Sequence, residues 1–342
     1  MRVLSAVLAA LLCLPAVVSA KPSANFEFLS REAVVTWFDG YRHKPEPSRL
    51  PAAVKALSRA NALRDPEAAG FHIGFIAATL GANPERAELL VVKMLPLPEA
   101  DQWAVVRAIA YSGLQDWKGL LRRVASRLPA RQAMIDQYLA GTLPTLDKIE
   151  LDKSPSFFEK IQMQAGIKQK TPDVSFGKNP ELLDTLWGQY FATGDYKPMY
   201  RILSMLPWSK DRDSVERLTV GSMAKVTLAN NATMYPDILM LLKTKAKYQP
   251  EDVAGPLAEV IQAAETTQAP RLKKDALASI EELKRKGPGY RREMTLWGTV
   301  GQGAIAVGCI AAAVVSLTAA GIPCVVGGAV TSAALSYWAA AQ

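Results

Sequence analysis

The stretch FIAATLG, residues 75–81, shows the organisation of this chain most clearly, because a shorter echo of it returns as FATG at residues 191–194. After a turn, each is followed by a helical segment that ends in Met-Leu-Pro, at residues 94–96 and 205–207. Glycine is common at a helix C-terminus, and proline stops the helix before it. The shared pattern predicts a repeated unit of two antiparallel helices, the first ended by glycine and the second by proline.

Helical periodicity extends over most of the chain. Apolar residues recur at intervals of three and four, and no sustained alternation of β-branched residues indicates a strand. Asn83 and Asp116 are predicted N-caps, and Pro250 opens a last helical region that is predicted to break near Ala269-Pro270. Because one helix pair cannot bury both of its faces, neighbouring pairs must stack. We therefore predict an all-α fold, an irregular solenoid-like array of antiparallel helix hairpins.

The chain divides by composition into five regions. Residues 1–20 combine a basic start, an apolar stretch and small residues at the end, which is the pattern of a signal peptide; an uncleaved anchor is the alternative. Residues 21–140 are predicted as an N-terminal helical domain, and residues 141–179, with several Pro and Gly, as a linker or long loop. Residues 180–293 are predicted as a second helical domain with a basic end, and residues 294–342 as a hydrophobic helical hairpin.

The last of these regions, Met294 to Gln342, contains no Lys, Arg, Asp or Glu. Two helices, from 296 to 319 and from 322 to 341, are each long enough to cross a hydrocarbon core of about 30 Å. Trp297 and Trp338 would lie at one level, as in an interfacial aromatic belt. Small residues would let the two helices approach closely, namely Gly298, Gly303 and Gly308. Ala, Gly, Ser and Thr favour insertion only weakly, so a hairpin buried in the soluble fold or in an oligomer stays open.

A basic segment precedes this hydrophobic region, with the clusters Lys284-Arg285-Lys286 and Arg291-Arg292. Beside a bilayer, such residues contact anionic headgroups and contribute about 1 kcal/mol each. After export this flank would face the non-cytoplasmic side, against the positive-inside preference. The prediction is that these five basic residues, with the tryptophans and glycines just named, associate with a membrane; the alternative is a solvated helix end.

The formal net charge is +8, and much of it lies in this basic segment. No basic stripe interleaved with aromatic residues indicates nucleic-acid binding. Cys13 leaves with the signal peptide, and Cys309 and Cys324 both lie in the hydrophobic region, so no disulfide framework is predicted. A large helical core must hold the mature protein together instead.

No sequence motif points to catalysis. The nucleophile elbow, the P-loop and the zinc-protease motif are absent, and no dinucleotide-binding glycine motif opens a helix. His43 lies in a polar turn, whereas His72 follows Phe71 in an apolar helix and is interpreted as a core residue. Neither histidine has another His or Cys at metal-ligand spacing, so no catalytic residue, cofactor or metal is assigned.

Three functions remain open. The first is an exported, non-enzymatic bacterial envelope protein, periplasmic and membrane-associated, whose helical array binds a protein or peptide and is tethered by the C-terminal hairpin. The second is a membrane-active protein whose basic flank and hairpin insert into an anionic bilayer. The third is an enzyme of unknown chemistry. Oligomer formation through the hairpin is open, and the layout lacks the repeating Trp, Leu, Gly and Tyr spacing of tetratricopeptide arrays.

Overall fold

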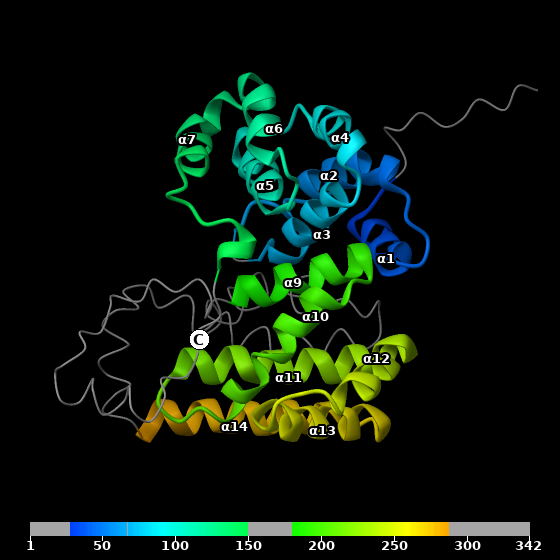
Figure 1. Cartoon of the computed structure of the whole chain (residues 1–342), viewed down its shortest axis with the longest axis vertical. Helices are drawn as coiled ribbons and strands as arrows, with labels where there is room; N and C mark the ends of the chain where they lie inside the picture. The colour runs from blue at the N-terminus through cyan, green and yellow to red at the C-terminus, as the bar shows by residue number, and fades with distance from the viewer. Residues whose placement is uncertain (1–27, 67, 150–179, 287–342) are drawn as a thin grey trace, which may run out of the picture.

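The computed structural model of this protein describes residues 28–66, 68–149 and 180–286 (Figure 1). This part of the chain is all-helical and contains no strand, which confirms the predicted fold class. The α-helices are α1 (Arg31–Tyr41), α2 (Leu50–Arg59), α3 (Gly70–Gly81), α4 (Ala87–Met94), α5 (Glu99–Tyr111), α6 (Trp117–Val124), α7 (Gln132–Ala140), α9 (Pro180–Thr193), α10 (Tyr196–Leu203), α11 (Val215–Met234), α12 (Pro236–Ala246), α13 (Glu251–Glu265) and α14 (Ala269–Lys286).

The helices form two groups that meet at α3 and α9. In Figure 1, α1 to α7 make the upper part of the molecule, α11 to α14 make the lower layers, and α9 runs between them. One hydrophobic core runs without interruption from Phe28 to Ile280. The residues before and after the predicted linker therefore share one core. Most of that linker, residues 141–179, lies outside the described residues.

The contact between α3 and α9 is the most extensive one between any two helices. Glycine lets the backbones touch. A methyl group added at Gly70 would lie 2.7 Å from the carbonyl oxygen of Glu181, and one added at Gly74 would lie 2.9 Å from Thr185 Cα. From the other side, a methyl group at Gly188 would lie 2.7 Å from the backbone nitrogen of Phe75. These contacts advance in the same direction along both helices, so α3 and α9 pack in parallel.

Aromatic side chains fill the space where α1 covers this pair. The ring of Phe38 lies 4.1 Å from that of Phe75, between centroids, and Trp37 lies 5.4 Å from the same ring. Phe71 of α3 contacts Phe191 of α9 at 5.8 Å. Tilted and edge-on ring pairs at these separations add to the hydrophobic stabilisation of burial. The first helix is thereby fixed onto both halves of the molecule.

The predicted helix signals are confirmed in most places. Asp116 caps α6 by accepting a hydrogen bond from the backbone N–H of Gly119. Gly81 is the last residue of α3, and Gly194, in the left-handed conformation with φ of 68°, directly follows α9. The helical region that opens at Pro250 breaks between α13 and α14, close to the predicted Ala269.

The prediction for Asn83 is confirmed in its position but not in its hydrogen bond, since Asn83 directly precedes the helical turn that Pro84 opens. Its side chain makes no N-cap hydrogen bond; its Nδ2 instead donates to the carbonyl oxygen of Thr79, 2.8 Å away, near the end of α3. The following residues, Pro84–Arg86, form a short 3-10 turn before α4 begins. An asparagine between two helices can hydrogen-bond to either, and here the free carbonyl of the preceding helix is the partner.

No helix in the described ranges has both the length and the apolar character needed to cross a membrane. The predicted hydrophobic hairpin at 294–342 lies outside those ranges, as does the predicted signal peptide at 1–20.

We predict that Gly74→Ala destabilises the protein by about 2–3 kcal/mol, because the added methyl group forces two packed backbones apart. Gly40→Ala is the matched control, since nothing lies within 4 Å of the added methyl group there. In that helical position alanine should stabilise by up to about 1 kcal/mol. Urea unfolding followed by tryptophan fluorescence measures both, and equal midpoints for the two variants would contradict the close contact.

Candidate interaction site

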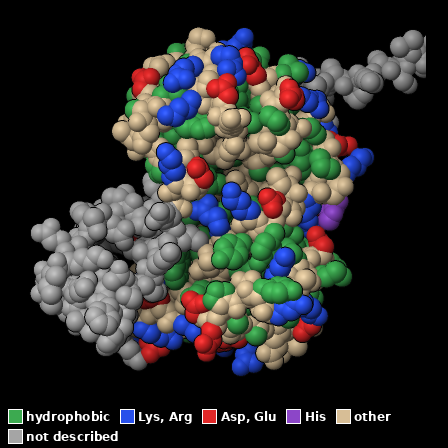
Figure 2. Space-filling view, in the orientation of Figure 1, with side chains coloured by type: hydrophobic (Ala, Val, Ile, Leu, Met, Phe, Trp, Pro, Cys, Tyr) green, Lys and Arg blue, Asp and Glu red, His purple; other side chains and the backbone are tan. Residues whose placement is uncertain are grey.

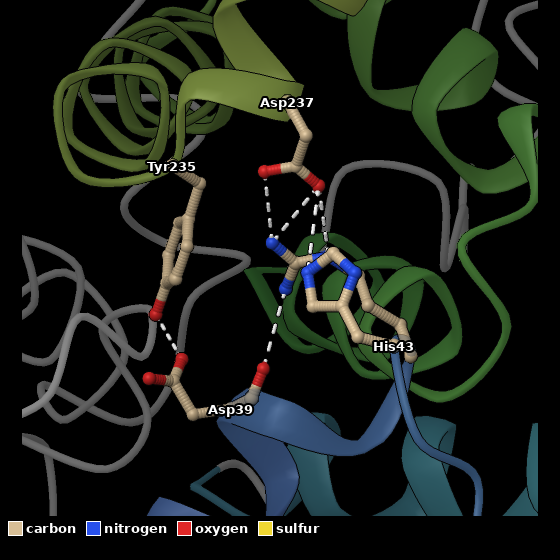
Figure 3. A network of polar contacts seen from close by, with 5 residues as sticks. Asp39, His43, Tyr235 and Asp237 are labelled. Carbon is tan, nitrogen blue, oxygen red and sulfur yellow. Dashed lines mark hydrogen bonds and ion pairs between the residues drawn. The ribbon is translucent and has the colours of Figure 1, made fainter.

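A polar network joins the end of α1 to the start of α12, and we call it the α1–α12 joint: Asp39, Arg42, His43, Tyr235 and Asp237 (Figure 3). Arg42 donates from Nε and Nη2 to the two carboxylate oxygens of Asp237, each at 3.1 Å. His43 Nε2 lies 3.8 Å from the same carboxylate. A bidentate pair of this kind fixes orientation as well as distance.

The guanidinium of Arg42 is enclosed by aromatic rings. Its central carbon lies 4.7 Å from the ring centroid of Tyr235 and 4.9 Å from that of Phe191. The Arg42 side chain is only 3% exposed, whereas that of Asp237 is 43% exposed. The charge is thus held by ring faces, by the carboxylate of Asp237 and by the backbone carbonyl of Asp39, to which Nη1 donates at 3.5 Å.

The second contact of the joint is the hydrogen bond that Tyr235 Oη donates to Asp39, and Figure 3 shows these two side chains pointing toward each other. Burial raises the pKa of Tyr235, and the hydrogen bond to Asp39 raises it further. Tyr235 therefore stays protonated and remains a donor at neutral pH. The joint therefore links α1 to α12 through two side-chain contacts.

A different surface has the character of a binding site, and we call it the tyrosine–lysine surface: Tyr196, Lys197, Tyr200, Lys245, Lys247 and Tyr248. In Figure 2, hydrophobic side chains gather on the near side of α10 and α12, with basic side chains among and beside them. Tyr200 is 53% exposed and Tyr248 is 69% exposed, although both are large aromatic residues. Tyrosine is enriched in protein interfaces, where its ring packs and its hydroxyl hydrogen-bonds, and charged residues belong to the polar rim of such interfaces.

The surface is built from two helices that hold each other. The Tyr196 and Tyr200 rings lie 6.2 Å apart on successive turns of α10. Lys245 Nζ of α12 lies 4.8 Å from the centroid of Tyr196, and Gln249 Nε2 donates to the hydroxyl of Tyr196 at 3.2 Å. These contacts fix Tyr196 as the centre, while Tyr200 and Tyr248 stay open to solvent.

The aromatic residues of α1, α9 and α10 differ clearly in burial. Trp37, Phe38 and Tyr41 are buried, as are Trp187, Tyr190 and Phe191. Tyr196 is half-buried and Tyr200 is exposed. Periodicity could not make this distinction, because both kinds of aromatic residue lie at helical spacing. The glycines that align α3 with α9 were not singled out from the sequence either, although the spacing of Gly70 and Gly74 by four residues was a signal for close helix packing.

The predicted membrane-associated residues lie at or beyond the end of the described chain. Lys284, Arg285 and Lys286 form the last turn of α14, where Arg285 is exposed. The others lie outside the described residues, namely Arg291, Arg292, Trp297, Gly298, Gly303, Gly308 and Trp338. Their association with a membrane stays a prediction.

The two histidines are placed as the sequence indicated. His43 lies in the joint with an exposed ring, and His72 is buried beneath α1, with its ring 5.8 Å from that of Phe38. Burial and, to a smaller extent, the nearby charge of Arg31 together lower the pKa of His72 to about 3. Within the described residues, no group of three or more His, Cys, Asp or Glu is placed to hold a metal ion.

We expect Asp237→Ala to destabilise the protein by about 2 kcal/mol, because it leaves the buried Arg42 charge without its carboxylate. Breaking a fully buried pair costs about 3–5 kcal/mol, and the exposure of Asp237 reduces this. Glu88→Ala is the control, since the Glu88–Arg123 pair is half-exposed on both sides and is worth at most about 1 kcal/mol. Urea denaturation measures the unfolding free energy of both variants. Similar losses of stability would mean that the Arg42–Asp237 pair contributes no more than a surface pair.

His72 should make stability depend on pH. The unfolded state binds a proton below the ordinary His pKa of about 6.5, whereas the folded state stays neutral down to about 3. Stability should therefore be full above pH ~6.5 and fall as pH drops toward 3, by about 1.4 kcal/mol for each unit. The measurement is the difference between wild type and His72→Leu in unfolding free energy across this window. A difference that does not change with pH would contradict the buried neutral imidazole.

Comparisons with known proteins do not indicate a function for this chain. No family of sequences matches the chain, and no solved structure matches it. Over 125 residues, or 34% of this chain, it is 26% identical to viral protein TPX of Thermoproteus tenax virus 1, strain VT3, and equally to that of strain KRA1. The matched part spans 24% and 32% of those two viral proteins, so the similarity is confined to a minor part of each.

Proposed function

We propose that this chain is a non-enzymatic binding module of the bacterial envelope. In this proposal the helical body recognises a protein or peptide partner through the tyrosine–lysine surface. The signal peptide at 1–20 exports it, and the hydrophobic region at 294–342 tethers it to a membrane.

The observation that carries the proposal is the exposure of Tyr200 and Tyr248 on a rigid frame. Large aromatic residues on a surface are the usual energetic anchors of protein interfaces. A frame that does not move lowers the entropy cost of binding, because the contact residues are already in place. Here α10 is packed on α9, which in turn meets the backbone of α3 directly at Gly74 and Gly188.

The proposed location depends on the two ends of the sequence. The apolar leader with small residues at its end supports export, and the uncharged C-terminal region supports a tether. The basic last turn of α14 would then lie next to anionic headgroups, where each basic residue contributes about 1 kcal/mol.

The finer architecture belongs to the same proposal. We propose that the helices continue as a solenoid-like array of hairpins that ends in the hydrophobic helical hairpin. Support comes from the second half, where consecutive helices contact each other: α9 with α10, α11 with α12, α12 with α13 and α13 with α14. Such an arrangement leaves one face of each pair for a partner.

The test is photo-crosslinking from Tyr200. A photoreactive phenylalanine replaces Tyr200 in the full chain, cells are irradiated, and membranes are washed with alkaline carbonate. We expect a discrete adduct that stays in the washed membrane pellet. The control carries the same group at Lys93, an exposed position on α4 in the other half of the molecule.

Each outcome addresses a separate part of the proposal. No adduct at Tyr200, or the same adducts at Lys93, would overturn the binding surface. An adduct that the carbonate wash releases would overturn the membrane tether and leave the binding surface standing.

A further inference from the structure

We propose that the tyrosine–lysine surface binds an acidic peptide segment of its partner, with carboxylates on the lysines and the peptide backbone along the tyrosines. This inference rests on the proposed function, since it names the chemistry of the partner. It is carried by the charges that the fold leaves unpaired on this surface and by the way the lysines cover the rings.

The lysines of the surface have no carboxylate partner in the described chain. Lys197, Lys245 and Lys247 form no ion pair with any described residue, whereas the neighbouring Lys243 is paired with Glu265. Arg201 is also committed internally, because it donates to the carbonyl oxygens of Leu146 and Ile149 at 3.0 and 2.6 Å. The fold thus gives Lys243 and Arg201 partners of their own and leaves Lys197, Lys245 and Lys247 without a carboxylate among the described residues.

The carboxylates nearest in sequence have other roles. Asp195 caps α10 by accepting a hydrogen bond from the backbone N–H of Lys197, at 3.2 Å. Glu251 and Asp252 lie in the first turn of α13, where the helix dipole favours negative charge. None of these carboxylates forms an ion pair with the three lysines, whose ammonium groups stay available to the carboxylates of an acidic ligand.

The placement of the lysines favours carboxylates over nucleic-acid bases. Lys245 Nζ stands 4.8 Å from the Tyr196 centroid, and Lys247 Nζ stands 4.9 Å from that of Tyr248. Single-stranded nucleic acid binds by stacking bases on open aromatic faces. Here an ammonium group occupies one face of each of these two rings, where a carboxylate can pair with it directly.

The geometry also suits an extended segment. Successive residues of a helix are rotated by about 100° around its axis. Viewed along α10, Tyr200 therefore projects between Tyr196 and Lys197. The turn after α12 carries Lys247 and Tyr248, and Gln249 of the same turn is hydrogen-bonded to Tyr196. The end of α12 and the turn after it thus adjoin α10 at Tyr196, so that one peptide can contact both elements.

The experiment titrates the purified full chain into a fluorescein-labelled oligoglutamate and follows fluorescence anisotropy. We expect saturable binding that weakens as salt is raised, because the contacts are exposed charges. The double variant Lys245→Glu/Lys247→Glu should bind about tenfold more weakly, since attraction becomes repulsion at two positions. Tyr200→Ala should cost about tenfold through loss of the exposed ring.

Lys93→Glu is the matched control, with the same charge reversal at an exposed lysine on α4, and it should leave binding unchanged. All four substituted positions carry exposed or half-exposed side chains, so the variants should keep the wild-type urea midpoint. Labelled oligothymidylate of equal length serves as the competing polyanion.

The inference would be overturned if Lys93→Glu weakened oligoglutamate binding as much as the double variant does, or if the double variant bound it as tightly as the wild type. Oligothymidylate that binds more tightly than oligoglutamate through the same residues would overturn it in favour of nucleic acid. If oligoglutamate fails to bind while the Tyr200 crosslink persists in cells, the acidic ligand is wrong and the binding module stands.

Discussion

The backbone contact between α3 and α9 is the constraint on which the rest of the structure depends. Gly70, Gly74 and Gly188 remove the side chains that would separate the two helices, and each of these positions meets backbone of the other helix. Two helices from distant parts of the chain are thereby brought to the smallest separation that backbone allows. The upper and lower groups of helices are then arranged on either side of this pair (Figure 1).

The α1–α12 joint fixes the orientation of the outer helices relative to this contact. The α3–α9 pair by itself fixes a distance, whereas the bidentate bond of Arg42 to Asp237 and the bond of Tyr235 to Asp39 fix how the outer helices sit on it. Hydrophobic packing is non-directional, and charge-assisted hydrogen bonds are directional. The combination explains why a large core and a small number of buried charges occur together at the boundary between the two halves.

The candidate site depends on which aromatic residues are buried and which are exposed. Buried aromatic residues such as Phe75 and Phe191 close the core, while Tyr200 and Tyr248, at similar helical spacing, remain outside. Whether an aromatic residue on a helix is core or surface depends on which neighbouring helix covers it. In the second half, α10 packs on α9 with its other face, so Tyr196 and Tyr200 are left beside the basic end of α12.

The sequence by itself determined the all-α class and several helix ends, because those depend on local features: periodic apolar residues, Asp116 as a cap and glycine after α9. It placed Asn83 correctly before a helical turn but missed its hydrogen bond, because two helix ends compete for that side chain. Only the tertiary structure decided that α3 packs on α9, that Arg42 meets Asp237, and that Tyr196 lies beside Lys245. These pairs are far apart in the chain, and their meeting follows from how helices stack, which no local pattern encodes.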